Sequence, residues 1–373
     1  MSGRRSALIE PLDSGYAVEF DTIDRDDWNA LLLKFSDASF YQTWEFGALR
    51  WGQNNVGHVI LKANGSVVAA VQLQVIPLPF LRTGVTYINW GPMWRLEGSQ
   101  PNFTHLRNIV RALRTEYSSN RGYLLRILPK VIPGDVREEV CRVFVEEGFD
   151  WKPDPQQTVL LDLSPSLEDI RRKFSRNVRR SLAYAEKQNL EIADRNDDIG
   201  CSAALKIAQE MRSRKGIGGL TDQVQIADIH RALPEFLKLK LLVCSLEGEP
   251  VAALGWPTIG KVGFPLFGGT GNKALKLKAS FLLWWRMISY YKLQGFHSCD
   301  LAAIDRKRNP GGYLFKRGFV GNDYEETEHY IGQFDSYRSR LFFLLVSMGQ
   351  SLLPIIRRIR ARYRRRSPLK ASR

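Results

Sequence analysis

The chain of 373 residues carries 54 Lys and Arg against 39 Asp and Glu, a net charge of +15 with an isoelectric point near 9.7. A hydrophobic fraction of 44% with nine Trp excludes general disorder, and the length suits about two domains. The four cysteines are scattered without a C-x-x-C pair, which argues against a disulfide framework or a cysteine-rich zinc site. The first fourteen residues lack the order of a signal peptide, so we expect a cytoplasmic protein.

Two segments, residues 59–74 and 241–256, have the pattern of the same β-hairpin. A shift of 183 residues aligns Gly65 with Gly248 and the letters VAAV with VAAL. The Asn-Gly pair ending at Gly65 is typical of a two-residue turn, because both residues can take positive φ. Since few positions match, chance similarity between two common hairpins is the alternative to a duplication.

The elements after each hairpin also repeat. A long helical pattern follows at residues 102–119 and 278–293, and then a short strand pattern at 123–128 and 298–304. This order predicts an α/β (α+β) fold of two domains of one type.

We therefore divide the chain into three parts. Residues 15–157 are expected to form the first domain and residues 158–335 the second. Residues 336–373 would be a basic amphipathic tail.

A strongly basic helix is expected at the start of the second domain, from about residue 168 to 188. Apolar residues at four-residue steps predict one buried stripe, made by Ile170, Phe174, Val178 and Leu182. Six basic residues between positions 171 and 180 occupy the remaining surface. Such a run is typical of a solvated helix face, and contact with a polyanion is the alternative.

Most of the positive charge lies at the C-terminus. Residues 337–373 contain ten Arg, one Lys and no acidic residue, a net charge of +11 that leaves only +4 for the rest of the chain. The preceding apolar stretch, residues 341–356, is shorter than the roughly 20 residues that span a bilayer.

This composition favours a helix in the membrane interface, with basic residues near anionic head groups. The basic residues meant are Arg357, Arg358, Arg360 and Arg364. A helix docked on the protein with a solvated tail, or an arm for RNA, are the alternatives.

A series of short motifs follows one another in a specific order. They are YQTWEFGALRWG (41–52), TVLLDLS (158–164), NLEIA (189–193), MRSRKGI (211–217), CDLAAID (299–305) and GGYLFKRGF (311–319). In order and spacing they resemble the Fem-type (FemABX) aminoacyltransferases, over about residues 16–335.

The resemblance implies two tandem GNAT-fold acyltransferase domains. It implies transfer of an amino acid from aminoacyl-tRNA to an amine of a lipid- or nucleotide-linked peptidoglycan precursor, hence a role in cell wall biogenesis and cell shape. The protein would be peripheral at the inner face of the plasma membrane. Because aminolysis of an ester needs neither metal nor covalent nucleophile, we expect no cofactor and no metal.

The candidate site residues come from the same resemblance. The pair Phe315-Lys316 matches the family position beside the reacting carbonyl, where a Lys would stabilise developing negative charge or help bind the tRNA terminus. Arg50 and Arg214 match positions that bind the phosphates of the precursor. For each cation the alternative is a structural charge at a helix end. The functional interpretation predicts Arg50, Arg214 and Lys316 around one groove.

Two departures from related enzymes leave other functions open. The glycine-rich segment 267–285 lacks the R/Q-x-x-G-x-G/A turn with which acetyl-CoA-dependent GNAT enzymes hold pyrophosphate, and the chain has no room for the coiled-coil arm of several Fem-type members. One rival is an N-acyltransferase that uses acyl-CoA or another donor on an aminosugar or envelope glycan. Another is a non-catalytic RNA- or membrane-binding protein.

Overall fold

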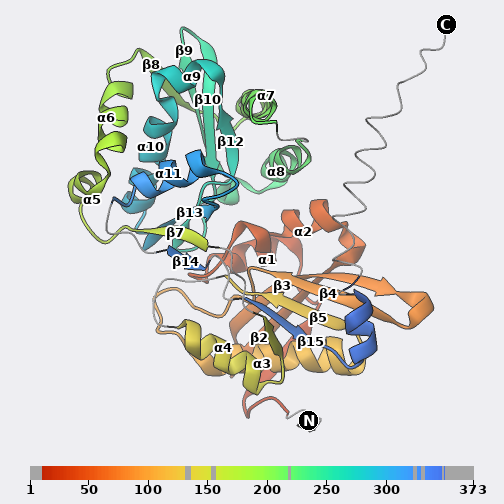
Figure 1. Ribbon diagram of the computed structural model, residues 1–373. Helices are drawn as coiled ribbons and strands as arrows, with labels where there is room; N and C mark the ends of the chain where they lie inside the picture. The colour runs from red at the N-terminus through yellow and green to blue at the C-terminus, as the bar shows by residue number, and fades with distance from the viewer. Residues whose placement is uncertain are drawn as a thin grey trace, which may run out of the picture.

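The protein consists of two mixed α/β halves that pack against each other (Figure 1). The computed structural model describes residues 11–130, 136–152, 157–216, 220–321, 326–328, 332–346 and 348. Arg357, Arg358, Arg360 and Arg364, which the sequence assigns to the membrane surface, lie outside these residues.

The first half is built on one sheet with the strand order β1-β2-β3-β4-β5-β15-β6. Among the described strand pairs of this sheet, β4 and β5 are parallel and the others are antiparallel. Helices α1 and α2 lie on one side of the sheet and α3 and α4 on the other (Figure 1). The strands are β1 (Tyr16–Phe20), β2 (Val56–Ala63), β3 (Ser66–Leu78), β4 (Thr83–Asn89), β5 (Leu124–Leu128), β6 (Asp150–Lys152) and β15 (Gln333–Ser336). The helices are α1 (Arg25–Leu32), α2 (Trp44–Trp51), α3 (Phe103–Leu113) and α4 (Arg137–Glu146).

The second half contains two four-stranded sheets, β12-β10-β9-β8 and β11-β13-β7-β14. The strands are β7 (Gln157–Asp162), β8 (Leu190–Asp194), β9 (Lys240–Leu246), β10 (Glu249–Trp256), β11 (Val262–Gly263), β12 (Phe267–Thr270), β13 (Ser298–Ile304) and β14 (Glu326–Glu328). The helices are α5 (Leu167–Lys173), α6 (Arg176–Ala185), α7 (Asp198–Arg214), α8 (Thr221–Ala232), α9 (Asn272–Leu277), α10 (Ala279–Leu293) and α11 (Pro310–Gly318).

The two predicted hairpins are β2–β3 and β9–β10, and they share their turn and their irregularity. Gly65 and Gly248 both have positive φ, at 82° and 77°, which a two-residue turn between twisted strands requires. Each second strand then carries one unopposed residue, Val68 in the first half and Val251 in the second. The two bulges are 183 residues apart, as the two glycines are. The two hairpins therefore share the position of the bulge in their strand pairing as well as the turn.

Each half completes its sheet with a strand that is distant in the chain. In the first sheet β15, from the C-terminal end, lies between β5 and β6; in the second half β7 lies between β13 and β14. A buried ion pair holds β15 in place, because the Nε of Arg126 on β5 donates to Asp335 at 2.7 Å and Nη2 donates to the second oxygen at 3.1 Å. Bidentate geometry of this kind favours one partner strand over others.

The expectation of one continuous basic helix is wrong. The chain breaks between α5 and α6, where Ser175 caps the second helix and its Oγ accepts a hydrogen bond from the N–H of Val178 at 3.3 Å. A serine at this position competes with helix continuation because its side chain satisfies an N–H at the next helix start. The four apolar residues of the predicted stripe are all buried, as expected.

Three apolar cores hold the molecule together. One lies within each half, and a third joins them, with Trp28, Phe35 and Trp90 from the first half against Ile207 and Phe264 from the second. Within the described residues, no helix is both long and apolar enough to cross a bilayer.

Candidate active site

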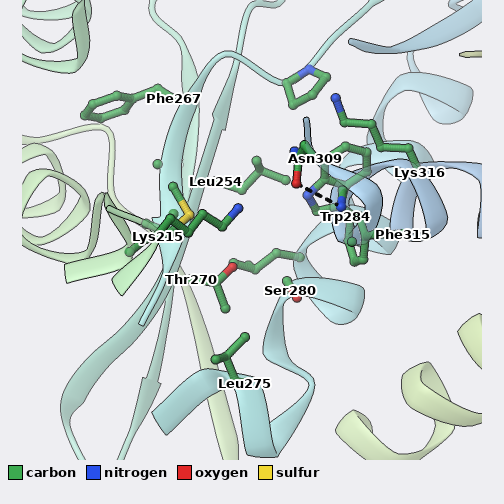
Figure 2. Close-up of a pocket in the computed structure, with 18 of the residues that line it drawn as sticks. Lys215, Leu254, Phe267, Thr270, Leu275, Ser280, Trp284, Asn309, Phe315 and Lys316 are labelled. Atoms are coloured by element: carbon green, nitrogen blue, oxygen red, sulfur yellow. Dashed lines mark hydrogen bonds between the residues drawn. The ribbon is translucent and has the colours of Figure 1, made fainter. Parts of the chain in front are cut away.

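A cavity of about 580 Å³ opens in the second half (Figure 2). Strands β10 and β12 form one wall, helices α10 and α11 form another, and the C-terminal end of α7 closes the rim. Most of the lining is apolar, including Leu254, Phe267, Leu283 and Trp284, and none of the described residues that line it is acidic. A negative charge that develops inside the cavity therefore meets few charged groups other than the cations at its edge.

Helix α11 carries the Phe-Lys pair, and both of its ends are fixed. At its start, the side-chain oxygen of Asn309 accepts a hydrogen bond from the N–H of Gly312 at 3.1 Å. At its end, Gly318 lies so close to α6 that an added Cβ would stand 2.5 Å from a methyl group of Val178. The glycine thus permits a close approach of two helices, which fixes how deep the preceding residues reach into the cavity.

Lys316 points its ammonium group at the end of β13. Its Nζ donates to the carbonyl oxygens of Ala302 at 3.1 Å and Ala303 at 2.8 Å. An ammonium has three N–H groups, so the described contacts leave one for a ligand. Lys316 and Lys215 approach the cavity from opposite sides (Figure 2).

The environment of Lys316 lowers its pKa. Burial has the largest effect and brings the pKa to about 8; the carboxylate of Asp300 opposes the shift and Lys215 adds to it. The side chain is therefore mostly a cation at neutral pH and loses its charge above pH 8. A group of this kind can stabilise negative charge near neutrality.

The carbonyls that hold Lys316 come from an irregular stretch of backbone. Ala302 has φ of 64°, a left-handed conformation that is strained for a residue with a Cβ, and the pairing of β13 with β7 is interrupted there. Asp300 stabilises this bulge, since it is 3% exposed and accepts hydrogen bonds from the N–H of Ala302 at 2.8 Å and from the hydroxyl of Thr158. Asp300 is thus a positioning residue for Lys316.

Asp300 has no predicted role from sequence, although it lies within the CDLAAID motif. A carboxylate inside a buried strand was the available signal, because a buried charge has to be paired or hydrogen-bonded.

Phe315 belongs to an aromatic wall beside Lys316. Its ring lies 4.9 Å from that of Phe281, 4.9 Å from that of Trp284 and 5.2 Å from that of Phe319, measured between ring centres. These packed rings make the wall rigid and exclude water from one side of the cavity.

Arg214 lines the same cavity at its rim. It is the last residue of α7, which Gly216 terminates with φ of 64°. Its Nη1 donates to the side-chain oxygen of Asn272 at 2.6 Å and its Nη2 to the carbonyl of Thr270 at 2.9 Å. The guanidinium is therefore held in a defined orientation while remaining exposed to solvent.

Arg50 lies outside the cavity lining. It projects from α2 and forms an ion pair of 3.2 Å with Asp222 at the start of α8. The next residue, Gln223, accepts a hydrogen bond from the N–H of Gly268, which does line the cavity. The structure thus brings Arg214, Phe315 and Lys316 together at the cavity and leaves Arg50 outside the lining, on α2 where it contacts α8. Among the described residues, no group of three His, Cys, Asp or Glu side chains is arranged to hold a metal ion.

The chain is similar to a known protein family in sequence and to several solved structures in fold. Residues 171–317, which contain most of the cavity lining, match the family described as Acetyltransferase (GNAT) domain. The structure of FemX aligns with a TM-score of 0.73 at 14% sequence identity, over 88% of this chain and 99% of that one. This chain has the tandem GNAT fold of FemX.

Two further structures align over similar lengths. One is a conserved protein of unknown function from Bacteroides thetaiotaomicron, with a TM-score of 0.55 at 11% identity over 86% of this chain and 99% of that one. The other is the C-terminal domain of a putative lysylphosphatidylglycerol synthetase from Agrobacterium fabrum, with a TM-score of 0.54 at 10% identity over 88% and 95%. No curated protein matches the chain.

The resemblance to the Fem-type family is thereby confirmed at the level of the fold, and so are the two tandem GNAT-like domains. The second half has the GNAT fold, and its match to the GNAT acetyltransferase family over residues 171–317 spans the cavity.

Proposed function

We propose that the protein is an aminoacyltransferase, which moves an amino acid from aminoacyl-tRNA to an amine of a peptidoglycan precursor. The observation that carries the proposal is the Lys316 ammonium, held by two backbone carbonyls in the wall of a mostly apolar cavity. The FemX fold and the fold shared with a putative lysylphosphatidylglycerol synthetase support an aminoacyl donor.

The chemistry is the aminolysis of an ester. The amine of the precursor attacks the ester carbonyl, and the carbonyl oxygen takes up negative charge in the tetrahedral intermediate. The remaining N–H of Lys316 would donate to this oxyanion; because the two carbonyls already fix the ammonium, little reorganisation is needed during the reaction. As the intermediate collapses, the C–O bond breaks, the former amine loses a proton and the ribose hydroxyl gains one.

The two arginines would bind the phosphates of a lipid- or nucleotide-linked precursor. Arg214 presents an oriented guanidinium at the rim, which suits phosphate oxygens. Arg50 would exchange its exposed ion pair with Asp222 for a phosphate, a small loss because exposed pairs contribute about 0–1 kcal/mol.

The test is a comparison of two labelled donors. Aminoacyl-tRNA and acyl-CoA, each labelled in the acyl group, are incubated with the full chain and peptidoglycan precursors, and the products are analysed by mass. Label transferred from the tRNA to the precursor supports the proposal; label transferred only from acyl-CoA contradicts it.

The second candidate is an N-acyltransferase that uses acyl-CoA on an aminosugar or envelope glycan, and the match to the Acetyltransferase (GNAT) family favours it. The turn at the start of α9 argues against it. There the N–H of Asn272 donates to the carboxylate of Glu210 at 2.9 Å, so an acidic group stands where a pyrophosphate would need free N–H groups. The same two-donor experiment decides between the candidates.

For the tail we propose contact with the anionic inner face of the plasma membrane, on the charge and apolar composition of residues 341–373. The rival is a non-catalytic RNA-binding protein. Deleting residues 349–373 separates the two, because the rival predicts loss of RNA binding and no transferase activity in the remainder. Transfer by the shortened chain contradicts the rival.

A further inference from the structure

A long hairpin in the first half ends in exposed apolar side chains. Strands β3 and β4 project from the sheet and are joined through Pro79–Leu81 (Figure 1). At this tip Phe80 is 101% exposed and Leu81 is 66% exposed, and Ile76 on β3 is exposed as well. Large apolar side chains grouped at a protruding tip contribute nothing to the cores and point to an interaction surface.

A second apolar row lies on the helical residues 340–346 and 348 near the C-terminus. Four exposed side chains recur at steps of three and four, which places them on one helix face: Leu341, Leu344, Leu345 and Met348. Phe343 instead packs on the protein, where its ring stacks on Tyr337 at 4.4 Å and lies under the ammonium of Lys152 at 4.4 Å. The helix is thus docked by one side, with its apolar row turned outward.

Both features leave the first sheet at the same end. The tip joins the start of β4, whose Val85 pairs with Leu124 at the start of β5. The next residue, Leu125, pairs with Ser336, after which the chain continues into the C-terminal helix. We call the seven exposed residues of the tip and the helix the apolar edge: Ile76, Phe80, Leu81, Leu341, Leu344, Leu345 and Met348.

Positive charge surrounds the apolar edge. Arg82 follows the tip directly, and Arg338 and Arg340 precede the helical row. The chain after residue 348 adds eight Arg and one Lys without any acidic residue. Apolar side chains that enter the acyl boundary, flanked by cations that meet head groups, are the pattern of a surface that lies on an anionic bilayer. RNA would use the cations but has no use for rows of leucine and methionine.

We propose that the apolar edge docks on an anionic lipid bilayer. The proposal goes beyond the transfer reaction and beyond the tail, because it places a membrane contact on the folded body. It also predicts which end of the first sheet faces the bilayer, namely the end where β4 begins and β15 ends. The tip would enter the interface as a wedge, and the helix would lie along it.

The test is co-sedimentation of the full chain with vesicles of phosphatidylcholine and phosphatidylglycerol, and with vesicles of phosphatidylcholine alone. The variants Phe80→Asp/Leu81→Asp and Leu344→Asp/Leu345→Asp should each weaken binding to the anionic vesicles by about tenfold or more. In each variant a negative charge replaces an apolar side chain that the bilayer would bury. Leu293→Asp and Phe236→Asp are the matched controls, as both residues are exposed but lie in the second half; they should bind as the wild type does.

Three further measurements keep the outcomes distinct. A Phe80→Ser/Leu81→Ser variant covers the case in which the charged variant fails to fold, and it should also bind more weakly. A chain without residues 349–373 shows whether the tail alone binds; wild-type binding by both edge variants, together with loss in the shortened chain, overturns the proposal.

Edge variants that lose tRNA binding but keep vesicle binding overturn it in favour of RNA. The vesicle assay measures binding and does not depend on transfer, so a failure of the transferase proposal leaves its result unaffected. Transfer to a soluble acceptor should be unchanged in the edge variants.

Discussion

Replacing Lys316 by methionine tests whether the side chain stabilises the oxyanion. The substitution keeps the length of the chain and removes the N–H donors, of which the described contacts leave one for the ligand. Loss of one donor to an oxyanion typically costs about 10²–10³ in kcat. Because the cavity is open at its rim and water can replace part of the interaction, we expect a fall of about 10–100-fold, or roughly 1.4–2.7 kcal/mol of barrier.

The assay is transfer of a labelled amino acid from aminoacyl-tRNA to a precursor amine, with kcat and KM determined separately. A group that acts in the transition state lowers kcat and leaves KM nearly unchanged. Lys187→Met, which removes an exposed lysine in the same half, should behave as the wild type.

The pH profile gives an independent check on the same residue. Burial lowers the pKa of Lys316 to about 8, and the cation is the active form, so wild-type kcat should decline as pH rises through about 8. In Lys316→Arg the charge persists to higher pH, and in Lys316→Met it is absent, so neither variant should show this decline. A folded Lys316→Met enzyme with wild-type turnover, or a decline that persists in it, would refute the role of Lys316.

Three more substitutions probe the surroundings of the cavity. Arg214→Ala should raise the Kd for a phosphate-bearing precursor by about tenfold, measured by calorimetry, and unchanged binding would remove this arginine from the substrate site. Asp300→Asn removes the carboxylate that raises the pKa of Lys316, so that pKa falls further and the alkaline decline in kcat should move below pH 8; a profile identical to the wild type would contradict the positioning role. Gly318→Ala places a Cβ 2.5 Å from a methyl group of Val178 and should lower the free energy of unfolding by about 1–3 kcal/mol in urea titration, whereas unchanged stability would show that the two helices separate at no cost.

The parts of the fold that depend on residues close together in the sequence could be predicted from local sequence patterns. The Asn64-Gly65 turn and the repeated order of elements follow from preferences and patterns of residues close together in the sequence, and the structure contains both. The break of the basic helix at Ser175 was also a local signal, but the unbroken apolar stripe on either side masked it.

The parts that escaped prediction depend on residues far apart in the chain. Nothing in the four residues of β15 indicates that it pairs with β5 rather than with a strand of the second half, because the specificity comes from Arg126 meeting Asp335. The same holds at the site: the partner of Arg50 is Asp222, and the carbonyls that hold Lys316 lie on a bulge organised by Asp300. Such contacts exist only once the tertiary structure has formed.

The place of β15 in the sheet of the first half has a consequence for how the protein is made. Arg126 and Asp335 are 209 residues apart, so the sheet of the first half lacks an internal strand until residues 333–336 have been synthesised. The first half therefore cannot complete its fold until the second half has been synthesised, and its exposed β5 edge needs protection from pairing with other chains in the meantime. Separately expressed halves should aggregate, while the two fragments produced together should assemble, so the two halves fold as one unit.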